Sequence, residues 1–385
     1  MSRRLRSRSR LAATLITSIA VTGGVALLLW GASSADGPPL EPETAPPKRA
    51  AGALAAPASS SFRIGVLYWS SHIEGQVAMR RGLEAEAETI NRAGEGPRVE
   101  LLPRVAGDGV EGRQRQIEQM EALLEAGVDA IIVQPTDNAA LAGALARANA
   151  AGIPVVAYDQ YVEGGHLAAY VTSDNRGAGQ LDGEYVAHRF PDDQNLKVVL
   201  VEYPHVSSTV ERLDGFTAAL KERGQPFTIV GTYKAVEPKA GAAVGQAILR
   251  DFPRPGSVDV VFTVNDGGGL AVVDALAGAG RTEIVVASID GDPASVRNIR
   301  AGRLTVIDAA QFCGPMGAAA LRAAYGVLRG EPVASRQLIP TFPITRETVD
   351  AYPGWMGPLP EAFEKPWPSR EPLWTPSAVP EVVAP

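Results

Sequence analysis

Short apolar runs alternate with amphipathic helical patterns along most of this chain of 385 residues, and this alternation restricts the fold more than any other feature. The apolar runs are too short to cross a membrane and end at polar residues or glycine, which is typical of buried parallel strands. Regular strand-then-helix order predicts parallel sheets with helices on both faces, the α/β class. Because the strands are too many for one open sheet, we expect two lobes with a cleft between them.

The periodicity also predicts where the elements lie. Strands are expected at 64–68, 99–102, 130–133, 155–158, 168–171, 197–201, 227–232, 258–264, 284–289 and 304–307. Helices are expected around 79–90, 117–124 and 141–148, and at 177–189, 210–223, 240–250, 267–278, 293–301 and 315–328.

Two strand-to-loop junctions indicate where the functional residues lie. Residues 260–267 and 284–291 are apolar runs that end in polar side chains followed by glycine. In α/β folds, ligands bind beyond the carboxyl ends of the strands. Asn265 and Asp290 are therefore expected to face one shared cleft.

Charge and residue content exclude several kinds of site. A net charge of −7 leaves no basic face of the kind that binds nucleic acid. The single cysteine, Cys313, rules out an intramolecular disulfide and argues against a cysteine metal site. The four histidines are scattered without metal-ligand spacing, so we expect neither a metal nor a cofactor.

The N-terminus carries an export pattern. Five arginines between residues 3 and 10 precede an uncharged stretch at 11–30, and positive charge before an apolar segment is typical of export signals. For residues 1–35 two interpretations stay open: a signal peptide cleaved at the small residues 33–35, or an uncleaved membrane anchor. Residues 36–61 are rich in Pro, Ala and Ser, which predicts a tether. The protein is therefore expected in the periplasm or on the cell surface.

The alternation stops beyond residue 350. Residues 351–385 are rich in proline and tryptophan and show no helical or strand period. This tail is either an extended strap packed on the body or a segment that docks a partner. We favour the strap, because isolated aromatic residues usually bury against their own domain.

Several motifs become specific when their order and spacing are taken together. They are AIIVQPTD at 130–137, GIPVVAYD at 152–159, TSDN at 172–175, ERLDGF at 211–216, the two junctions above, and Ala310-Gln311. With these motifs the chain resembles the type I periplasmic binding proteins, and most closely their ribose-binding branch, over roughly residues 62–345.

The resemblance implies two Rossmann-like lobes joined by a three-segment hinge, which close on a small sugar or polyol. It implies the following division: an N-terminal lobe of 62–173 plus 312–340, a C-terminal lobe of 174–311 plus 341–350, and a tail at 351–385.

The resemblance also implies which residues contact the ligand. Asp159, Arg212, Asn265, Asp290 and Gln311 match the cleft residues of the family. Carboxylates accept hydrogen bonds from sugar hydroxyls at charge-assisted strength, and an arginine offers a fixed fork of donors. The amide side chains each supply a donor and an acceptor.

Other positions depart from the ribose branch. Gln160 stands where the family often has arginine, and Gly75, Gln76 and Val236 stand where that branch has aromatic residues. Other rings must therefore stack on the sugar. The candidates are Tyr68 and Trp69, followed by Tyr158, Tyr161, Tyr203 and Phe312. A different monosaccharide or a polyol fits this pattern as well as ribose.

Simpler interpretations of the same residues stay open. Asp159 and Asp290 could be helix N-caps. Arg212 could pair only with Glu211 or Asp214 on its own helix. The two aspartates could also be the acid and base of a glycosidase, although the resemblance explains both without catalysis.

The resemblance favours a monomeric binding protein, not an enzyme, that captures a monosaccharide or polyol outside the cytoplasmic membrane for an ABC permease. The alternative is a co-receptor that reports its ligand to a membrane sensor kinase or chemoreceptor. Processing near Ala35 favours transport, and a retained N-terminus favours sensing.

Overall fold

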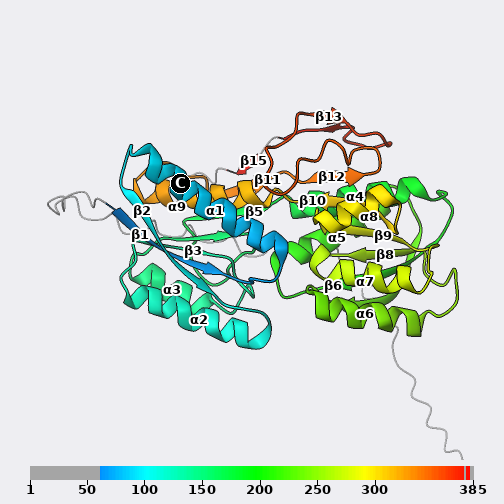
Figure 1. The fold of residues 1–385 in the computed structure, drawn as a ribbon, viewed down its shortest axis with the longest axis horizontal. Coiled ribbons are helices and arrows are strands. Elements are labelled where there is room, and N and C mark those ends of the chain that lie inside the picture. The colour runs from blue at the N-terminus through cyan, green and yellow to red at the C-terminus, as the bar shows by residue number, and fades with distance from the viewer. Residues whose placement is uncertain (1–60, 377–378, 382–385) are drawn as a thin grey trace, which may run out of the picture. The chain divides into compact units, whose positions relative to one another are not determined.

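The computed structural model describes residues 61–376 and 379–381. The predicted export segment, and the predicted tether apart from Ser61, lie outside the described residues. Among the helices of the described part, none is long and apolar enough to cross a membrane. Two sheets dominate this part, each with helices on both faces, which confirms the expected α/β class (Figure 1).

The first sheet has the strand order β15-β11-β5-β4-β3-β1-β2. Its strands are β1 (Ser61–Tyr68), β2 (Arg98–Val105), β3 (Ala130–Val133), β4 (Val155–Tyr158), β5 (Ala169–Ser173), β11 (Arg336–Ile339) and β15 (Val379–Glu381). All neighbours pair in parallel except β15, which is antiparallel to β11. All four residues of β3 are buried, which explains its unbroken apolar sequence.

Helices cover both faces of this sheet, and together they form the first lobe. The helices are α1 (Glu74–Ala93), α2 (Gly109–Glu125), α3 (Ala142–Ala150) and α9 (Cys313–Leu328). Helices α1 and α9 pack on one face around Met79, Leu83 and Leu321, whereas α2 and α3 pack on the other around Leu123 and Leu145 (Figure 1).

The second sheet has the order β12-β10-β9-β8-β6-β7 and is parallel except for β12. Its strands are β6 (Leu196–Glu202), β7 (Phe227–Lys234), β8 (Val260–Thr263), β9 (Val285–Asp290), β10 (Thr305–Ala310) and β12 (Phe342–Thr345). With α4 (Asn175–Arg189), α5 (Ser207–Glu222), α6 (Pro238–Asp251), α7 (Asp266–Gly278) and α8 (Pro293–Ala301) it forms the second lobe.

The packing of the second lobe brings α5 close to the other elements of the site. Phe216 of α5 stacks on Phe262 of β8 with ring centroids 4.2 Å apart. Gly179 lets α4 and α5 touch, because a Cβ at this position would lie 1.9 Å from the carbonyl oxygen of Arg212. Any larger residue there would push α5 away from α4 and move Arg212.

The chain passes between the two sheets three times, as the resemblance implied. The first passage follows β5, the second lies between β10 and α9, and the third lies between β11 and β12. These passages are short, so the carboxyl ends of the parallel strands of both sheets lie near them.

Most expected elements are present with ends shifted by a few residues. The sequence patterns missed β11 and β12, whose sequences RQLI and FPIT are not the unbroken apolar runs of the equally short β3 and β4. They also missed the short strands of the tail, β13 (Phe363–Glu364), β14 (Leu373–Trp374) and β15. Such strands exist because a partner strand is available, not because of their own sequence.

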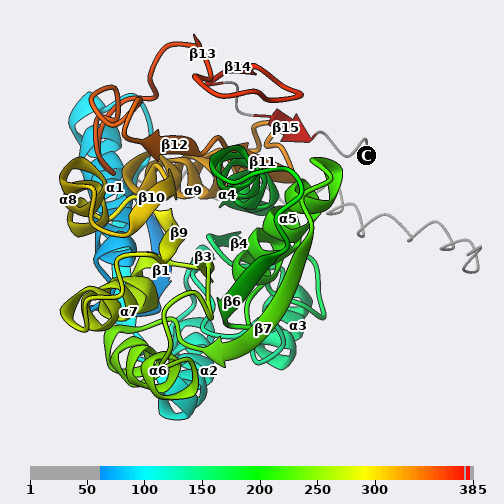
Figure 2. The same cartoon turned by 90° about the vertical axis from the view of Figure 1, so that its right-hand side faces the viewer.

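The tail beyond residue 350 lies beside β11, β12 and α4 (Figures 1 and 2). Two of its tryptophans are buried: Trp367 packs edge-on against Tyr185 of α4, and Trp374 packs against Phe342 of β12. The indole nitrogen of Trp374 donates to the carbonyl oxygen of Thr341, 2.7 Å away, in the third passage between the sheets. The tail thus contacts the second lobe and the hinge.

Candidate functional site

The strand order places a binding site at the same point of each sheet. In the first sheet β1 lies between β2 and β3, and in the second β6 lies between β7 and β8. The direction of winding reverses there, and ligands of α/β sheets bind in the crevice at this point. A cavity is found there, and both lobes contribute residues to it.

Seven of the eight predicted ligand-binding residues line this cavity. They are Trp69, Asp159, Gln160, Arg212, Asn265, Asp290 and Gln311. Trp69 follows β1, Asp159 follows β4, Asp290 ends β9, and Gln311 follows β10. The carboxyl ends of the strands therefore supply most of these residues.

Tyr68 is the exception, because it does not line the cavity. It is the last residue of β1 and is buried in the core between the first sheet and α1. Its hydroxyl lies 3.4 Å from Glu84 of α1. Neighbouring side chains of a strand point to opposite faces of the sheet. The side chains of Tyr68 and Trp69 therefore cannot both point toward the cavity.

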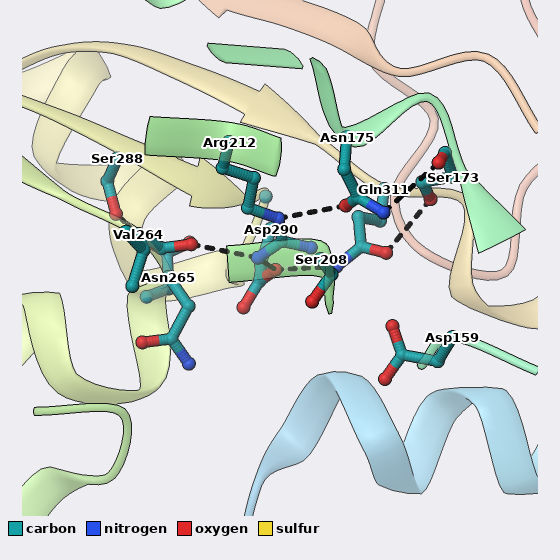
Figure 3. Close-up of polar contacts among 12 residues, drawn as sticks. Asp159, Ser173, Asn175, Ser208, Arg212, Val264, Asn265, Ser288, Asp290 and Gln311 are labelled. Carbon is teal, nitrogen blue, oxygen red and sulfur yellow. Dashed lines mark hydrogen bonds and ion pairs between the residues drawn. The ribbon is translucent and has the colours of Figure 1, made fainter. Parts of the chain in front are cut away.

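Arg212 and Asp290 form the centre of a polar cluster (Figure 3). A guanidinium nitrogen of Arg212 donates to Asp290 Oδ1 at 2.9 Å and to the carbonyl oxygen of Val264 at 2.9 Å. The Nε of Arg212 donates to Asn175 at 2.9 Å. Arg212 thus pairs with the end of β9, so the idea that it pairs only within its own helix is wrong.

Gln311 connects this cluster to the first lobe. Its amide nitrogen donates to Asp290 Oδ1 at 2.6 Å, and its amide oxygen accepts from the Ser173 hydroxyl at 2.9 Å (Figure 3). Because the amide oxygen and one amide N–H are engaged, Gln311 orients the Asp290 carboxylate and, like Asn265, keeps one N–H for a ligand.

Asp159 lies apart from this cluster, on the first lobe (Figure 3). Gln134 donates to its Oδ2 at 2.8 Å. The hydroxyl of Thr172 donates to its backbone oxygen at 2.8 Å, which fixes the loop after β4. The next residue, Gln160, accepts a hydrogen bond from the backbone of Ser208 at 3.2 Å, which links the two lobes at the cavity.

Both aspartates have an unusual backbone conformation. The φ angle is 63° at Asp159 and 136° at Asp290, in the region that favours glycine. Residues other than glycine in this region tend to occur at functional sites, where surrounding contacts hold them in place. Neither aspartate is an N-cap, since Asp159 is followed by the strand β5 and the helix after Asp290, α8, is capped by Asp292.

Asn265 has two functions in the geometry of the site. Its side-chain oxygen accepts from the backbone of Gly268 at 3.2 Å and caps α7, and its nitrogen donates to the carbonyl oxygen of Val236 at 2.9 Å. One amide proton is left for a ligand. The cap and the cavity contact are therefore compatible.

Burial shifts the pKa of both carboxyl groups in the same direction. Burial raises the pKa of Asp159, and the hydrogen bond from Gln134 opposes this effect. Burial also raises the pKa of Asp290, where the Arg212 charge is the main opposing influence. Asp159 has no ion-pair partner in the described residues, whereas Asp290 does.

Two hydrogen-bonding groups at the cavity have no protein partner among the described residues. They are the indole nitrogen of Trp69 and the hydroxyl of Ser208, and both are buried. A buried polar group without a partner costs roughly 1–3 kcal/mol. A ligand that supplies partners for these groups removes this cost.

Sequence reasoning missed several lining residues. They are Ile73, Met79, Val206, Ser208 and Thr209, together with Gly75, Gln76 and Val236, which were noted only as lacking aromatic rings. Ser208 and Thr209 lie in the first turn of α5, where Ser and Thr are so common that they give no signal of binding. Of the aromatic candidates, only Trp69 lines the cavity.

The cavity encloses about 30 Å³, which holds about two water molecules. A monosaccharide needs more room, so its entry requires the lobes or the lining side chains to move apart. A larger cavity of about 510 Å³ lies between α4, the hinge at Pro340 and Thr341, and the tail, and none of the predicted ligand-binding residues lines it. Within the described part, no group of three or more His, Cys, Asp or Glu is placed to hold a metal ion.

Comparison with known proteins agrees with this geometry. A family model described as a periplasmic binding protein domain matches residues 64–332. The chain belongs to the periplasmic binding protein family. This assignment confirms the resemblance seen in the sequence, including the type I fold and the ribose-binding-like branch.

Several periplasmic binding proteins are similar to this chain. The ribose import binding protein of Bacillus subtilis is 28% identical over 71% of this chain and 83% of its own length. A xylitol-binding protein of Mycolicibacterium smegmatis is 28% identical over 76% of this chain and 79% of its own length. The crystal structure of a Caulobacter myo-inositol binding protein with myo-inositol has a TM-score of 0.66 and 26% identity, covering 78% of this chain and 97% of that one.

Proposed function

We propose that this protein binds a monosaccharide or a related polyol between its two lobes, outside the cytoplasmic membrane, and delivers it to an ABC permease. The observation that carries the proposal is the cavity at the strand ends, with two buried carboxylates, an arginine and two donors that lack protein partners. The similar proteins named above, which bind ribose, xylitol or myo-inositol, support the ligand class.

The chemistry of the cavity suits a neutral ligand with many hydroxyl groups. Each hydroxyl donates one hydrogen bond and accepts others. Asp159 and Asp290 can accept from hydroxyls, whereas Trp69, Asn265 and Arg212 can donate to them. The charge of Arg212 is already balanced by Asp290, and Asp159 has no ion-pair partner in the described residues, so an anionic ligand is disfavoured.

The single ring at the cavity argues for a particular contact. Trp69 can stack its ring on the apolar face of a sugar or donate its indole N–H to a hydroxyl. Gly75 and Val236 also line the cavity and carry no ring. We infer that the ligand is held more by hydrogen bonds than by stacking between two aromatic rings.

A sensory co-receptor is the second candidate, since it would use the same closure of the lobes. The charge pattern of residues 3–30 favours it only if that segment stays attached as an anchor. The N-terminal sequence of the protein isolated from cells separates the two candidates: a start after residue 35 supports transport, and a start at residue 1 or 2 supports sensing.

A thermal-shift series tests the ligand class. The purified protein is melted with D-ribose, D-allose, xylitol and myo-inositol, with amino acids as controls. A ligand at about 100 times its Kd adds roughly 2.7 kcal/mol of stability, which raises the melting midpoint by several degrees. We expect a stereoselective rise with one sugar or polyol. A rise with an amino acid alone contradicts the proposed ligand class.

A further inference from the structure

The backbone that carries Asp290 turns sharply at the end of β9. Asp290 has a φ angle of 136° and Gly291 one of 79°, so two consecutive residues are in the region that favours glycine. The turn is also tightly enclosed. A Cβ at Gly291 would lie 2.4 Å from the Cβ of Ala310 and 2.7 Å from the hydroxyl of Tyr352 in the tail. Such a turn keeps its shape only if its surroundings hold it.

Three side chains bind the backbone of this turn. Asp308 accepts from the Gly291 nitrogen at 2.9 Å, and Asp266 accepts from the Asp292 nitrogen at 2.8 Å. The indole nitrogen of Trp355 donates to the carbonyl oxygen of Asp290 at 2.6 Å. The first two side chains belong to the second lobe, but Trp355 lies in the tail, beyond residues 64–332 that match the family model.

Trp355 also contacts the first lobe. Its carbonyl oxygen accepts from the backbone of Gly314, in the first turn of α9, at 2.9 Å. Its ring lies 3.8 Å from the position that a Cβ of Gly75 would take, and Gly75 lines the cavity. One residue of the tail therefore binds α9 of the first lobe, lies next to Gly75 in the wall of the cavity, and binds the turn of Asp290 in the second lobe.

A second tail residue supports the same region. The hydroxyl of Tyr352 donates to the carbonyl oxygen of Gln311 at 3.4 Å, and its ring stacks on Phe342 with centroids 5.7 Å apart. Gln311 in turn donates to the Asp290 carboxylate. Two residues of the tail thus hold the backbones of two residues that line the cavity.

We propose that Trp355 is a positioning residue for ligand binding: its indole N–H holds the Asp290 carbonyl group, and the tail thereby fixes the direction of the Asp290 carboxylate toward the ligand. The inference rests on the proposed function and assigns a role in binding to the C-terminal tail. Loss of this hydrogen bond leaves the turn free to relax, so the carboxylate no longer stands ready for the ligand.

The tail offers a matched control. Trp367 is buried like the core residues, and its indole nitrogen has no hydrogen-bond partner in the described part of the chain. Replacing either tryptophan by phenylalanine keeps an aromatic ring and removes one N–H group. Only Trp355→Phe removes a hydrogen bond to the turn at Asp290.

The test measures Kd by titration calorimetry for the wild type, Trp355→Phe and Trp367→Phe. The probe is whichever of D-ribose, D-allose, xylitol and myo-inositol gives the largest thermal shift with the wild type. One hydrogen bond contributes about 0.5–1.5 kcal/mol, so we expect Trp355→Phe to weaken binding about 2- to 10-fold and Trp367→Phe to leave Kd unchanged. Melting of the unliganded variants shows whether the fold is equally stable.

The outcomes separate the two ideas. A higher Kd for Trp355→Phe alone, at a melting midpoint no lower than that of Trp367→Phe, supports the positioning role. Equal Kd values for the wild type and Trp355→Phe, or equal losses in both variants, overturn it while the proposed function stands. If the wild type binds none of the four probes, the proposed function fails, and this inference fails with it.

Discussion

Asp159 and Asp290 are both buried carboxylates at the cavity, but their surroundings differ. Asp290 accepts from Arg212 and Gln311, so its charge is compensated by the protein. Asp159 accepts from the neutral Gln134 and has no ion-pair partner in the described residues. Burial raises the pKa of both carboxyl groups; the hydrogen bond from Gln134 leads the opposing influences at Asp159, and the Arg212 charge leads them at Asp290. Without ligand, the Asp159 charge is therefore a cost to the fold.

We predict that Asp159→Asn lowers ligand affinity and leaves the unliganded protein as stable as the wild type, or more stable, at neutral pH. Asparagine can still accept from Gln134 but carries no buried charge, and it loses the charge-assisted bonds to hydroxyls. Those bonds contribute about 1.5–3 kcal/mol each, which corresponds to roughly a 10- to 100-fold rise in Kd.

Calorimetry and melting of the unliganded protein check this prediction together. The contrasting variant is Asp290→Asn, which leaves Arg212 buried without its carboxylate and should lower both affinity and stability. If Asp159→Asn destabilises the unliganded protein as much as Asp290→Asn does, the distinction between the two carboxylates is wrong.

For single residues, the sequence predicted which residue types lie at the site better than it predicted where each side chain points. Asn265 and Asp290 were predicted at the cavity because strand ends in an α/β sheet converge, whereas Asp159 and Arg212 were implied by the family resemblance. The end of β1 was predicted correctly at Tyr68, but the pattern did not show that the Tyr68 side chain faces the core and not the cavity. Ser208 could not be recognised from the sequence, because its only mark is a buried hydroxyl group without a partner in the described residues.

The junction of β9, β10 and α7 contains a second group of buried carboxyls. Asp266 and Asp308 hold the backbone of the turn after Asp290, and both are buried. Burial raises the pKa of Asp308 to about 7. Burial, followed by the neighbouring Asp308 carboxylate, holds the pKa of Asp266 well above its usual range. At pH values between the unfolded and the folded pKa of these groups, the native protein therefore keeps protons that the unfolded chain has lost.

This arrangement predicts that stability falls as pH rises. A carboxyl whose pKa is raised on folding contributes its stability fully below the unfolded pKa, and the contribution is lost as pH rises through the folded pKa. For Asp308 this window runs from an ordinary value near 3.8 to about 7. We expect Asp308→Asn, which can still accept from Gly291, to raise the melting midpoint at pH 8 and to reduce its fall between pH 5 and pH 8.

The control is Asp350→Asn, which replaces a side chain that is 85% exposed and pairs with Arg300. Changes at such surface positions usually stay within about 0.5 kcal/mol. Melting curves of the three proteins at several pH values decide the matter. An unchanged pH dependence in Asp308→Asn contradicts the assignment of the slope to this buried group.

Elements with a local signal were predictable, and elements without one were not. The helix α8 was expected at the residues it occupies, and in the structure Asp292 with Pro293 and Gly302 lie at its two ends. In contrast, β11 and β12 depend on pairing with β5 and β10, which are far away in sequence. A pattern read along the chain contains the local signal but not the distant partner.

In the described part, the tail contacts both lobes and the hinge. It forms β15 at the edge of the first sheet, packs Trp367 on α4 of the second lobe, and binds the hinge through Trp374. The division into lobes of 62–173 plus 312–340 and 174–311 plus 341–350 remains a prediction. If the lobes close along this division, the tail moves together with the cavity residues that it contacts.

We propose that a sugar or polyol binds between the lobes at the Asp290 carboxylate. Titration calorimetry of the wild type and of Asp290→Asn, with D-ribose, D-allose, xylitol and myo-inositol, tests this proposal. We predict that one of these compounds binds the wild type at one site per chain and that Asp290→Asn weakens the same compound at least about 10-fold, as expected for charge-assisted bonds. Binding that is equally strong in Asp290→Asn, or no binding of any of the four by the wild type, contradicts the claim.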